Sequence, residues 1–250
     1  MLRNRETLFL TFFIIYTKCA MAIIDGDLAE ISDYPYAASI IADNLHMCGG
    51  SIIGAKHILT AASCVGAFKA ANLIVRAGSS LYDEGGQLAK VESINLHPNF
   101  VEEYLLNNIA ILVLSEALEL GKNVTVIQWN TEDIPITGNG TIVGWGIVVK
   151  EENGWVKPYR PSVQLRVTHQ PVVGAWTCEN TFLKDWHEDT MFCAGLYRTE
   201  NCVGDIGNPF VVNGIQVGIA SEVLLICDEF PTAYINVKNY ADFIITFLKS

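Results

Sequence analysis

Seven cysteines constrain what this chain can fold into, because an odd set cannot pair completely. Cys19 stands apart from the other six, just behind the hydrophobic run LFLTFFIIY at residues 8–16. Basic residues precede this run, and Ala20 and Ala22 follow it with the spacing that signal peptidase accepts. Nine residues are too few to cross a bilayer as a helix. We therefore expect a signal peptide over residues 1–22, with a buried N-terminal helix as the alternative.

Cleavage after Ala22 would leave six cysteines, and an even set in a secreted protein indicates three disulfides. It would also remove three basic residues and one acidic residue, which changes the formal charge from −11 to −13. The same compartment exposes sequons to glycosylation, and two occur, at Asn123 and Asn139. The sequence thus predicts a secreted, extracellular protein without a membrane anchor.

Composition excludes several classes of protein. Half of the residues are hydrophobic and only 17% are charged, which is too hydrophobic for a disordered chain. The acidic balance argues against nucleic acid or anionic membranes as partners, because both attract clustered Lys and Arg. No cysteine, histidine and carboxylate cluster has metal-ligand spacing, Asp83-Glu84 is too little for a calcium loop, and no glycine-rich phosphate loop occurs. We expect neither a metal nor a cofactor.

The body of the chain has the pattern of an all-β fold. Residues 162–168 alternate apolar and polar side chains, as a half-buried strand does. Asn139-Gly140 and Asn213-Gly214 are hairpin-type turn signals. Short apolar runs recur between turns, at 51–53, 57–62, 73–76, 109–114, 141–143 and 214–220. Many short strands indicate a sandwich or barrel, whereas Val237, Tyr240, Ala241, Ile244, Phe247 and Leu248 share one face of a C-terminal helix.

Five motifs in this order carry a resemblance: Cys48-Gly49-Gly50-Ser51, Leu59-Thr60-Ala61-Ala62-Ser63-Cys64, Asn108-Ile109-Ala110-Ile111-Leu112, Gly144-Trp145-Gly146 and Cys202-Val203-Gly204-Asp205-Ile206-Gly207-Asn208-Pro209. Along the whole chain after residue 22 they resemble the chymotrypsin-like serine proteases. The resemblance implies two packed six-stranded antiparallel β-barrels, over about 23–130 and 131–235, with a C-terminal helix at 236–250. It also implies the disulfides Cys48–Cys64, Cys178–Cys193 and Cys202–Cys227.

The three positions of the family's catalytic triad carry other side chains here. Where the motifs place histidine, aspartate and serine, this chain has Ser63, Asn108 and Ile206. A triad needs a nucleophile, an imidazole that takes its proton and a carboxylate that orients the imidazole. A sec-butyl group has no lone pair and cannot attack a carbonyl. The sequence therefore predicts a serine protease homologue that is not an enzyme.

The substrate pocket of the family is also altered. Its specificity position corresponds to Glu200, and two wall positions that are glycine in open-pocket members correspond to Val223 and Thr232, with Glu222 at an adjacent tryptophan. Added side chains and a charge predict an occluded pocket, with neutral drift in an unused pocket as the alternative. Asp205 is kept, and in the family this carboxylate pairs with the freed N-terminal amine. Cleavage after Ala22 would create that amine at Ile23 directly.

Within the family the pattern looks most like the inactivated protease paralogues of the scabies mite, relatives of the group 3 mite allergens. The resemblance implies a protein that binds secreted host proteins, in particular complement components, and inhibits complement. A decoy or cofactor that binds inhibitors or substrates of active sister proteases is the alternative, and a hydrolase with unrecognised residues is a third.

N-terminal sequencing of the secreted protein tests the predicted processing. We expect the mature chain to begin at Ile23, because the sequence offers a small residue at position 22 rather than the Arg or Lys that a trypsin-like activator cleaves after. A mature chain that starts at any other residue contradicts both the cleavage site and the Ile23–Asp205 ion pair.

Overall fold

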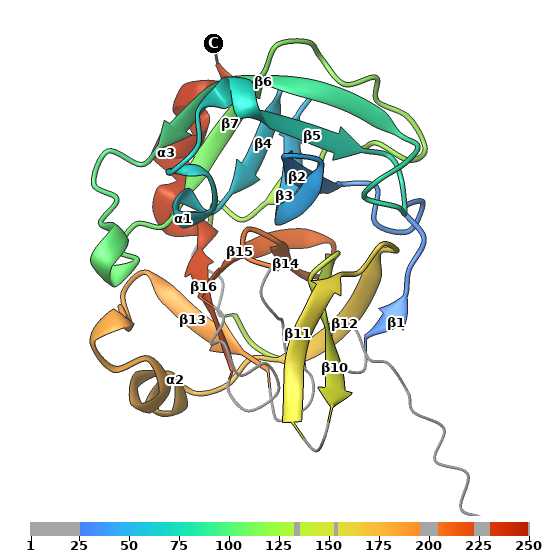
Figure 1. The fold of residues 1–250 in the computed structure, drawn as a ribbon. Helices are drawn as coiled ribbons and strands as arrows, with labels where there is room; N and C mark the ends of the chain where they lie inside the picture. The colour runs from blue at the N-terminus through green and yellow to red at the C-terminus, as the bar shows by residue number, and fades with distance from the viewer. Residues whose placement is uncertain (1–25, 133–135, 153–154, 196–204, 223–230, 250) are drawn as a thin grey trace, which may run out of the picture.

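The computed structural model describes residues 26–132, 136–152, 155–195, 205–222 and 231–249, and within these the side chains of 147–161, 184 and 222 are left out of the description. The fold is mostly β, with two sheet systems stacked on one another (Figure 1). The expected all-β class is confirmed. Among the described residues, no helix has the length and apolar character needed to span a membrane.

The first sheet is a closed antiparallel barrel with the strand order β2-β3-β4-β7-β6-β5. Its interior is filled by branched aliphatic side chains that are almost completely buried, among them Ile40, Ile58 and Ile111. Such residues pack well on a pleated surface, so the short apolar runs of the sequence become the barrel strands. The strands are β2 (Ala37–Ala42), β3 (Leu45–Gly54), β4 (His57–Thr60), β5 (Leu73–Ala77), β6 (Gln87–Leu96) and β7 (Ala110–Leu114).

The second sheet has eight strands, and an isolated bridge between Val172 and Ala194 brings its two sides together. Six strands, β12-β9-β14-β15-β16-β13, thereby encircle a core that contains Phe210 and Tyr234. The strands are β1 (Asp27–Leu28), β8 (Gln128–Trp129), β9 (Asn139–Gly144), β12 (Arg166–Pro171), β13 (Met191–Ala194), β14 (Pro209–Val212), β15 (Ile215–Glu222) and β16 (Thr232–Asn236). The short strands β1 and β8 come from the first part of the chain but pair with this second sheet. A separate hairpin consists of β10 (Ile147–Glu152) and β11 (Trp155–Pro161).

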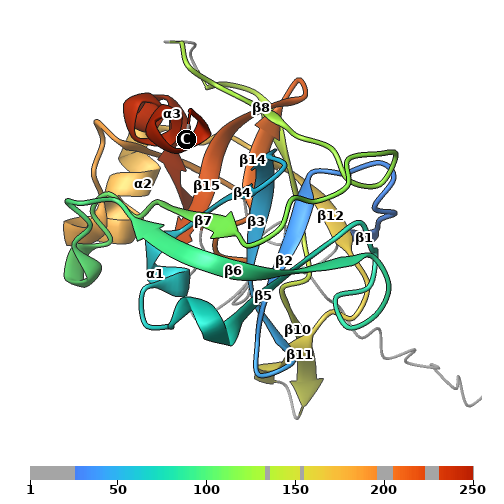
Figure 2. The same cartoon turned by 90° about the horizontal axis from the view of Figure 1, so that it is seen from above.

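The helices are short and lie outside the sheets (Figure 2). The expected C-terminal helix is present as η4 (Val237–Tyr240) followed by α3 (Ala241–Leu248). The sequence analysis missed α2 (Ala175–Phe182), which follows the second sheet's β12. The other helical segments are α1 (Ala62–Val65), η1 (Ala70–Asn72), η2 (Glu102–Tyr104) and η3 (Leu183–Asp185).

Two local expectations differ from the structure. The Asn139-Gly140 pair does not form a turn; it begins β9, and the positive φ belongs to the preceding Gly138. The predicted strand at 162–168 is displaced toward the C-terminus, because pairing with β9 starts only at Arg166. By contrast, Asn213 and Gly214 both have positive φ and join β14 to β15 as a hairpin, as the sequence predicts.

Gly207 of the second barrel packs against Gly49 and Thr60 of the first barrel, in a space that admits only a glycine. Its φ is +87°, and an added Cβ would lie 2.3 Å from both the Gly49 carbonyl oxygen and the Thr60 hydroxyl. We expect Gly207→Ala to lower the free energy of unfolding clearly more than the roughly 1–2 kcal/mol of left-handed strain alone. Gly214→Ala is the matched control, since Gly214 has φ +80° and open space around it. Equal losses for the two variants in urea unfolding would contradict this close contact.

Candidate functional site

The centre of the site is the side-chain amide of Asn108, which is fully buried between the two barrels. Its Oδ1 accepts the backbone N–H of Ser63 at 2.7 Å. Its Nδ2 donates to the Ser63 hydroxyl at 2.9 Å and to the Ser221 hydroxyl at 2.9 Å. The Ser221 carbonyl lies 3.3 Å from the same nitrogen. One amide therefore ties α1 of the first barrel to β15 of the second.

The backbone partners fix the orientation of this amide. The Ser63 N–H can only donate, so it requires the oxygen of Asn108, and the Ser221 carbonyl can only accept, so it requires the nitrogen. A carboxylate at this position could not donate to the Ser221 carbonyl. The preceding Asn107 has φ +55°, a conformation that asparagine tolerates, and this turn directs Asn108 inward. The structure thus brings together Ser63 and Asn108, two of the three residues expected at the triad positions.

Ile206 lies in the turn before β14 and contributes hydrocarbon to the same region. Its half-buried side chain packs against a hydrophobic core cluster that contains residues of both barrels. Its carbonyl oxygen accepts the Gly49 N–H at 2.9 Å and lies 3.6 Å from the sulfur of Cys64. The backbone around this residue therefore serves as a junction between the barrels, while its side chain has no polar atom.

The Asp205 carboxylate is fully buried, next to Ile206. Its Oδ1 accepts the Gly146 N–H at 3.1 Å and the Asn208 side-chain amide at 2.8 Å. An added Cβ on Gly146 would lie 2.0 Å from this carboxylate, so the glycine makes room for it. Ile23, its expected partner, lies outside the described residues. Sequence reasoning assigned no role to Asn208, although this buried amide stands in the same motif as Asp205.

The other expected sites divide between described and undescribed parts of the chain. Disulfides Cys48–Cys64 and Cys178–Cys193 are present. Thr232, at one expected pocket wall, is only 1% exposed and pairs with Ala194 in the sheet. Both sequon asparagines are exposed, Asn123 in a turn and Asn139 at the start of β9. Outside the description lie the side chain of Glu222 and all of Glu200, Cys202, Val223 and Cys227.

The histidines have partners elsewhere. His46 is buried and shares a hydrogen bond of 2.7 Å with Ser39. His169 is bonded to Thr141 at 3.1 Å, and His187 donates to the Tyr104 carbonyl at 3.1 Å. Burial lowers the pKa of His57, with a further contribution from the charge of Lys56. The hydrogen bonds of His46, His169 and His187 hold each imidazole in place within the fold.

No group of three or more metal-ligating side chains occurs within the described parts of the chain. The loop that contains Asp83 and Glu84 is instead held by the mostly buried Arg76, whose guanidinium donates to the carbonyls of Gly85 and Asp83. The positive charge of the Arg76 guanidinium therefore lies next to these carbonyl oxygens.

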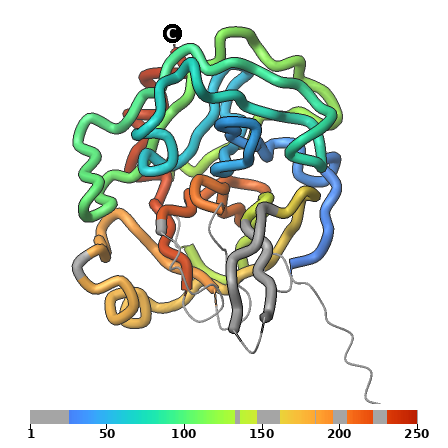
Figure 3. Tube along the Cα trace, viewed as in Figure 1, coloured from blue at the N-terminus to red at the C-terminus, as the bar shows by residue number. Residues whose placement is uncertain are grey.

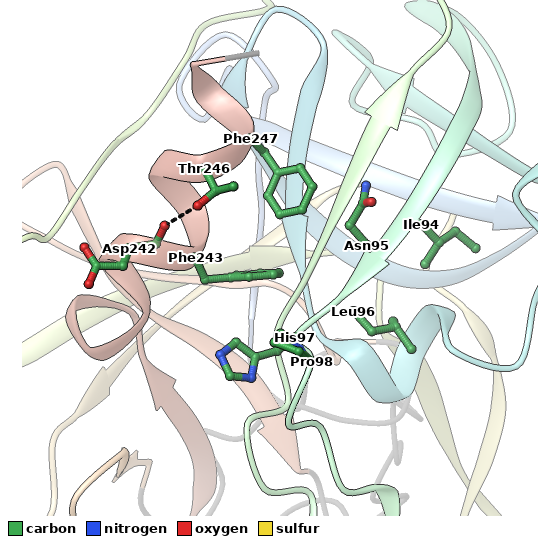
Figure 4. Close-up of a pocket in the computed structure, with 9 residues that line it drawn as sticks. All are labelled: Ile94, Asn95, Leu96, His97, Pro98, Asp242, Phe243, Thr246 and Phe247. Atoms are coloured by element: carbon green, nitrogen blue, oxygen red, sulfur yellow. Dashed lines mark hydrogen bonds between the residues drawn. The ribbon is translucent and has the colours of Figure 1, made fainter.

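A separate hollow of about 630 Å³ lies between the end of β6 and α3 (Figure 4). His97 packs edge-on against Phe243, with ring centroids 5.1 Å apart, and against Tyr240 at 5.3 Å. Burial lowers the pKa of His97, and its Nδ1 accepts the Asn99 N–H. These contacts hold the C-terminal helix on the first barrel, on a surface different from the Asn108 centre.

Comparison with known proteins identifies the family to which this two-barrel fold, with its buried Asn108 junction, belongs. The trypsin family profile matches residues 23–244, and the chain therefore belongs to the trypsin family. Hypodermin-B of Hypoderma lineatum is 33% identical over 201 residues, with 80% of this chain and 76% of the relative covered. Trypsin of Phaedon cochleariae is 32% identical over 238 residues, with 92% and 90% covered.

Among solved structures, the scabies mite inactivated protease paralogue S-D1 superposes with a TM-score of 0.80. The two chains are 26% identical, and the match covers 91% of this chain and 97% of the paralogue. The expected resemblance to that group is confirmed.

The hydrogen bonds of Asn108 predict how substitutions at the junction change the free energy of unfolding. Asn108→Ala removes the partners of the Ser63 N–H and the Ser221 carbonyl, so we expect the free energy of unfolding to fall by about 2–3 kcal/mol. Ser63→Ala removes only one hydroxyl and should cost less. In a double-mutant cycle measured by urea unfolding, the two residues should couple by about 0.5–1.5 kcal/mol. A coupling of zero would show that the Asn108–Ser63 side-chain bond contributes nothing.

Proposed function

We propose that this protein is a secreted, catalytically inactive member of the trypsin family that acts by binding proteins and inhibits host complement. The observation that carries the proposed loss of activity is the hydrocarbon side chain of Ile206, whose carbonyl lies 3.6 Å from the sulfur of Cys64, the residue after Ser63. Peptide hydrolysis by this family needs a hydroxyl nucleophile with a base within hydrogen-bond reach. Isoleucine supplies neither a lone pair nor a proton for such a reaction.

The hydrogen bonds of Asn108 and Ser63 support the same proposal. Asn108 uses its amide hydrogens toward Ser63 and Ser221, whereas an orienting carboxylate would only accept. Ser63 has a hydroxyl, but its side-chain partner is the Asn108 amide rather than a base. Loss of the nucleophile alone removes about six orders of magnitude in turnover in serine proteases. What remains is a scaffold with its barrel junction intact.

The remaining features of the proposal concern the pocket and the N-terminus. We infer that Glu200, Glu222, Val223 and Thr232 close the specificity pocket, which agrees with the burial of Thr232. We also infer that the Ile23 amine pairs with Asp205, whose carboxylate is already positioned by Asn208 and Gly146. The protein would then be secreted directly in an activated-like conformation.

The choice of partner rests on the resemblance to the mite paralogues and on charge. The chain carries a formal charge of −11, which suits basic surfaces on a partner. Loops on a rigid barrel scaffold can bind proteins without any catalytic step. Host complement components in plasma are the proposed partners.

A haemolysis assay tests this function. We expect the purified protein to reduce lysis through at least one complement pathway in a concentration-dependent manner. The control is the same chain after reduction and alkylation, which keeps the charge but loses the fold. The same preparation should take up no fluorophosphonate label, with active trypsin as the positive reference.

Two results would overturn the proposal. Undiminished lysis through all complement pathways would remove complement from the function. A covalent fluorophosphonate adduct on the intact chain would show that a nucleophile exists after all.

A further inference from the structure

Helix α2 and the residue that follows it present two large hydrophobic side chains to solvent. Trp176 is 76% exposed and Leu183 is 70% exposed, the highest values among the large hydrophobic residues that the structure describes. Trp176 and the exposed Glu179 are three residues apart and share one side of α2, and Leu183 directly follows the last residue of the helix. Exposed apolar groups gathered in this way mark interaction sites on soluble proteins.

The opposite side of α2 is anchored in the protein. Cys178 and Phe182 are 1% and 4% exposed, and the disulfide Cys178–Cys193 fastens the helix to β13. Trp176 and Leu183 therefore project from a fixed support rather than from a free loop. A rigid support lowers the conformational entropy that a binding partner must overcome.

Leu183 also adopts an unusual backbone conformation, with φ +50° and ψ −114°. Leucine rarely occupies this region, and the strain is not offset by burial, because the side chain is mostly in solvent. Backbone strain at an exposed apolar residue is typical of functional surfaces.

The surroundings of α2 are acidic. Residues 175–190 contain four acidic residues, Glu179, Asp185, Glu188 and Asp189, against Lys184 alone. His187 links this region to the 101–106 loop of the first barrel through its bond to the Tyr104 carbonyl. That loop adds the exposed Glu102 and Glu103, and it lies directly above the α2 region at the left of the molecule (Figure 3).

We propose that this α2 face, made of Trp176, Glu179 and Leu183 with its acidic rim, is the docking surface for a basic protein segment that carries apolar side chains. The inference rests on the proposed binding function and names the surface that performs it. Aromatic and aliphatic anchors inside a charged rim are the usual arrangement of a binding hot spot. Like charge disfavours both a second copy of this chain and an anionic membrane on the same face.

The test uses a fluorescein-labelled peptide of alternating arginine, leucine and glycine, with a glutamate-for-arginine peptide as the charge control. Fluorescence anisotropy should show binding of the basic peptide to the intact protein, weakening as salt rises. The Trp176→Ala/Leu183→Ser double variant should bind at least about tenfold more weakly. Glu179→Lys should also weaken binding and reduce the dependence on salt.

The matched control is Leu88→Ser/Leu120→Ser, which removes two hydrophobic side chains that are 59% and 54% exposed on the first barrel. We expect this variant to bind like the unmodified protein. All variants are first checked by thermal unfolding, and since the substituted side chains are exposed, their midpoints should agree closely. Equal weakening in the α2 and control variants would overturn the proposal, as would absence of peptide binding.

The haemolysis assay separates this inference from the proposed function. Peptide binding that depends on α2, without any effect on complement, supports the surface and removes complement as the partner. Inhibition of complement that is equal in the α2 and control variants leaves the function standing and overturns the surface. Sedimentation that shows a dimer lost only in the α2 variant would assign the face to a second copy of the chain and also overturn the proposal.

Discussion

The junction between the two barrels is the constraint on which the rest of this structure depends. Its hydrogen bonds use groups other than the side chain of Ile206: the Gly49 N–H donates to the Ile206 carbonyl, and Asn108 bridges Ser63 and Ser221. Buried polar groups of this kind must be satisfied wherever water is excluded. Because Ile206 contributes its backbone carbonyl to this junction, a chain can change the side chain at this position and still keep the hydrogen bond to Gly49.

Asn108 shows how such a change can be accommodated. The Asn108 amide accepts the Ser63 N–H and directs its two hydrogens toward the Ser63 hydroxyl and toward Ser221, whose hydroxyl and carbonyl both lie near Nδ2, without placing a buried charge between the barrels. A buried ionised carboxylate without a cationic partner is costly. With no imidazolium to stabilise at position 63, a neutral amide is the group that fits this junction.

The sequence predicts the parts of the fold that depend on covalent spacing and on short apolar runs. Most barrel strands and the C-terminal helix follow from such local patterns, whereas the disulfides Cys48–Cys64 and Cys178–Cys193 follow only from the resemblance to the family. Features set by tertiary contacts were missed. Helix α2 has weak apolar periodicity because its outer face carries Trp176, and Asn208 becomes significant only when folding places its amide against Asp205.

The barrel junction and the surface of α2 are separate parts of this protein, and they have different functional requirements. The proposed loss of hydrolysis concerns the junction, where the Asn108 amide is hydrogen-bonded to Ser63 and Ser221. Binding has a different requirement, a rigid support with exposed apolar groups, and a disulfide-anchored helix such as α2 supplies it away from the barrel core. Selection on the surface can therefore proceed without disturbing Asn108 or Gly207, because the two regions share no hydrogen bond among those described.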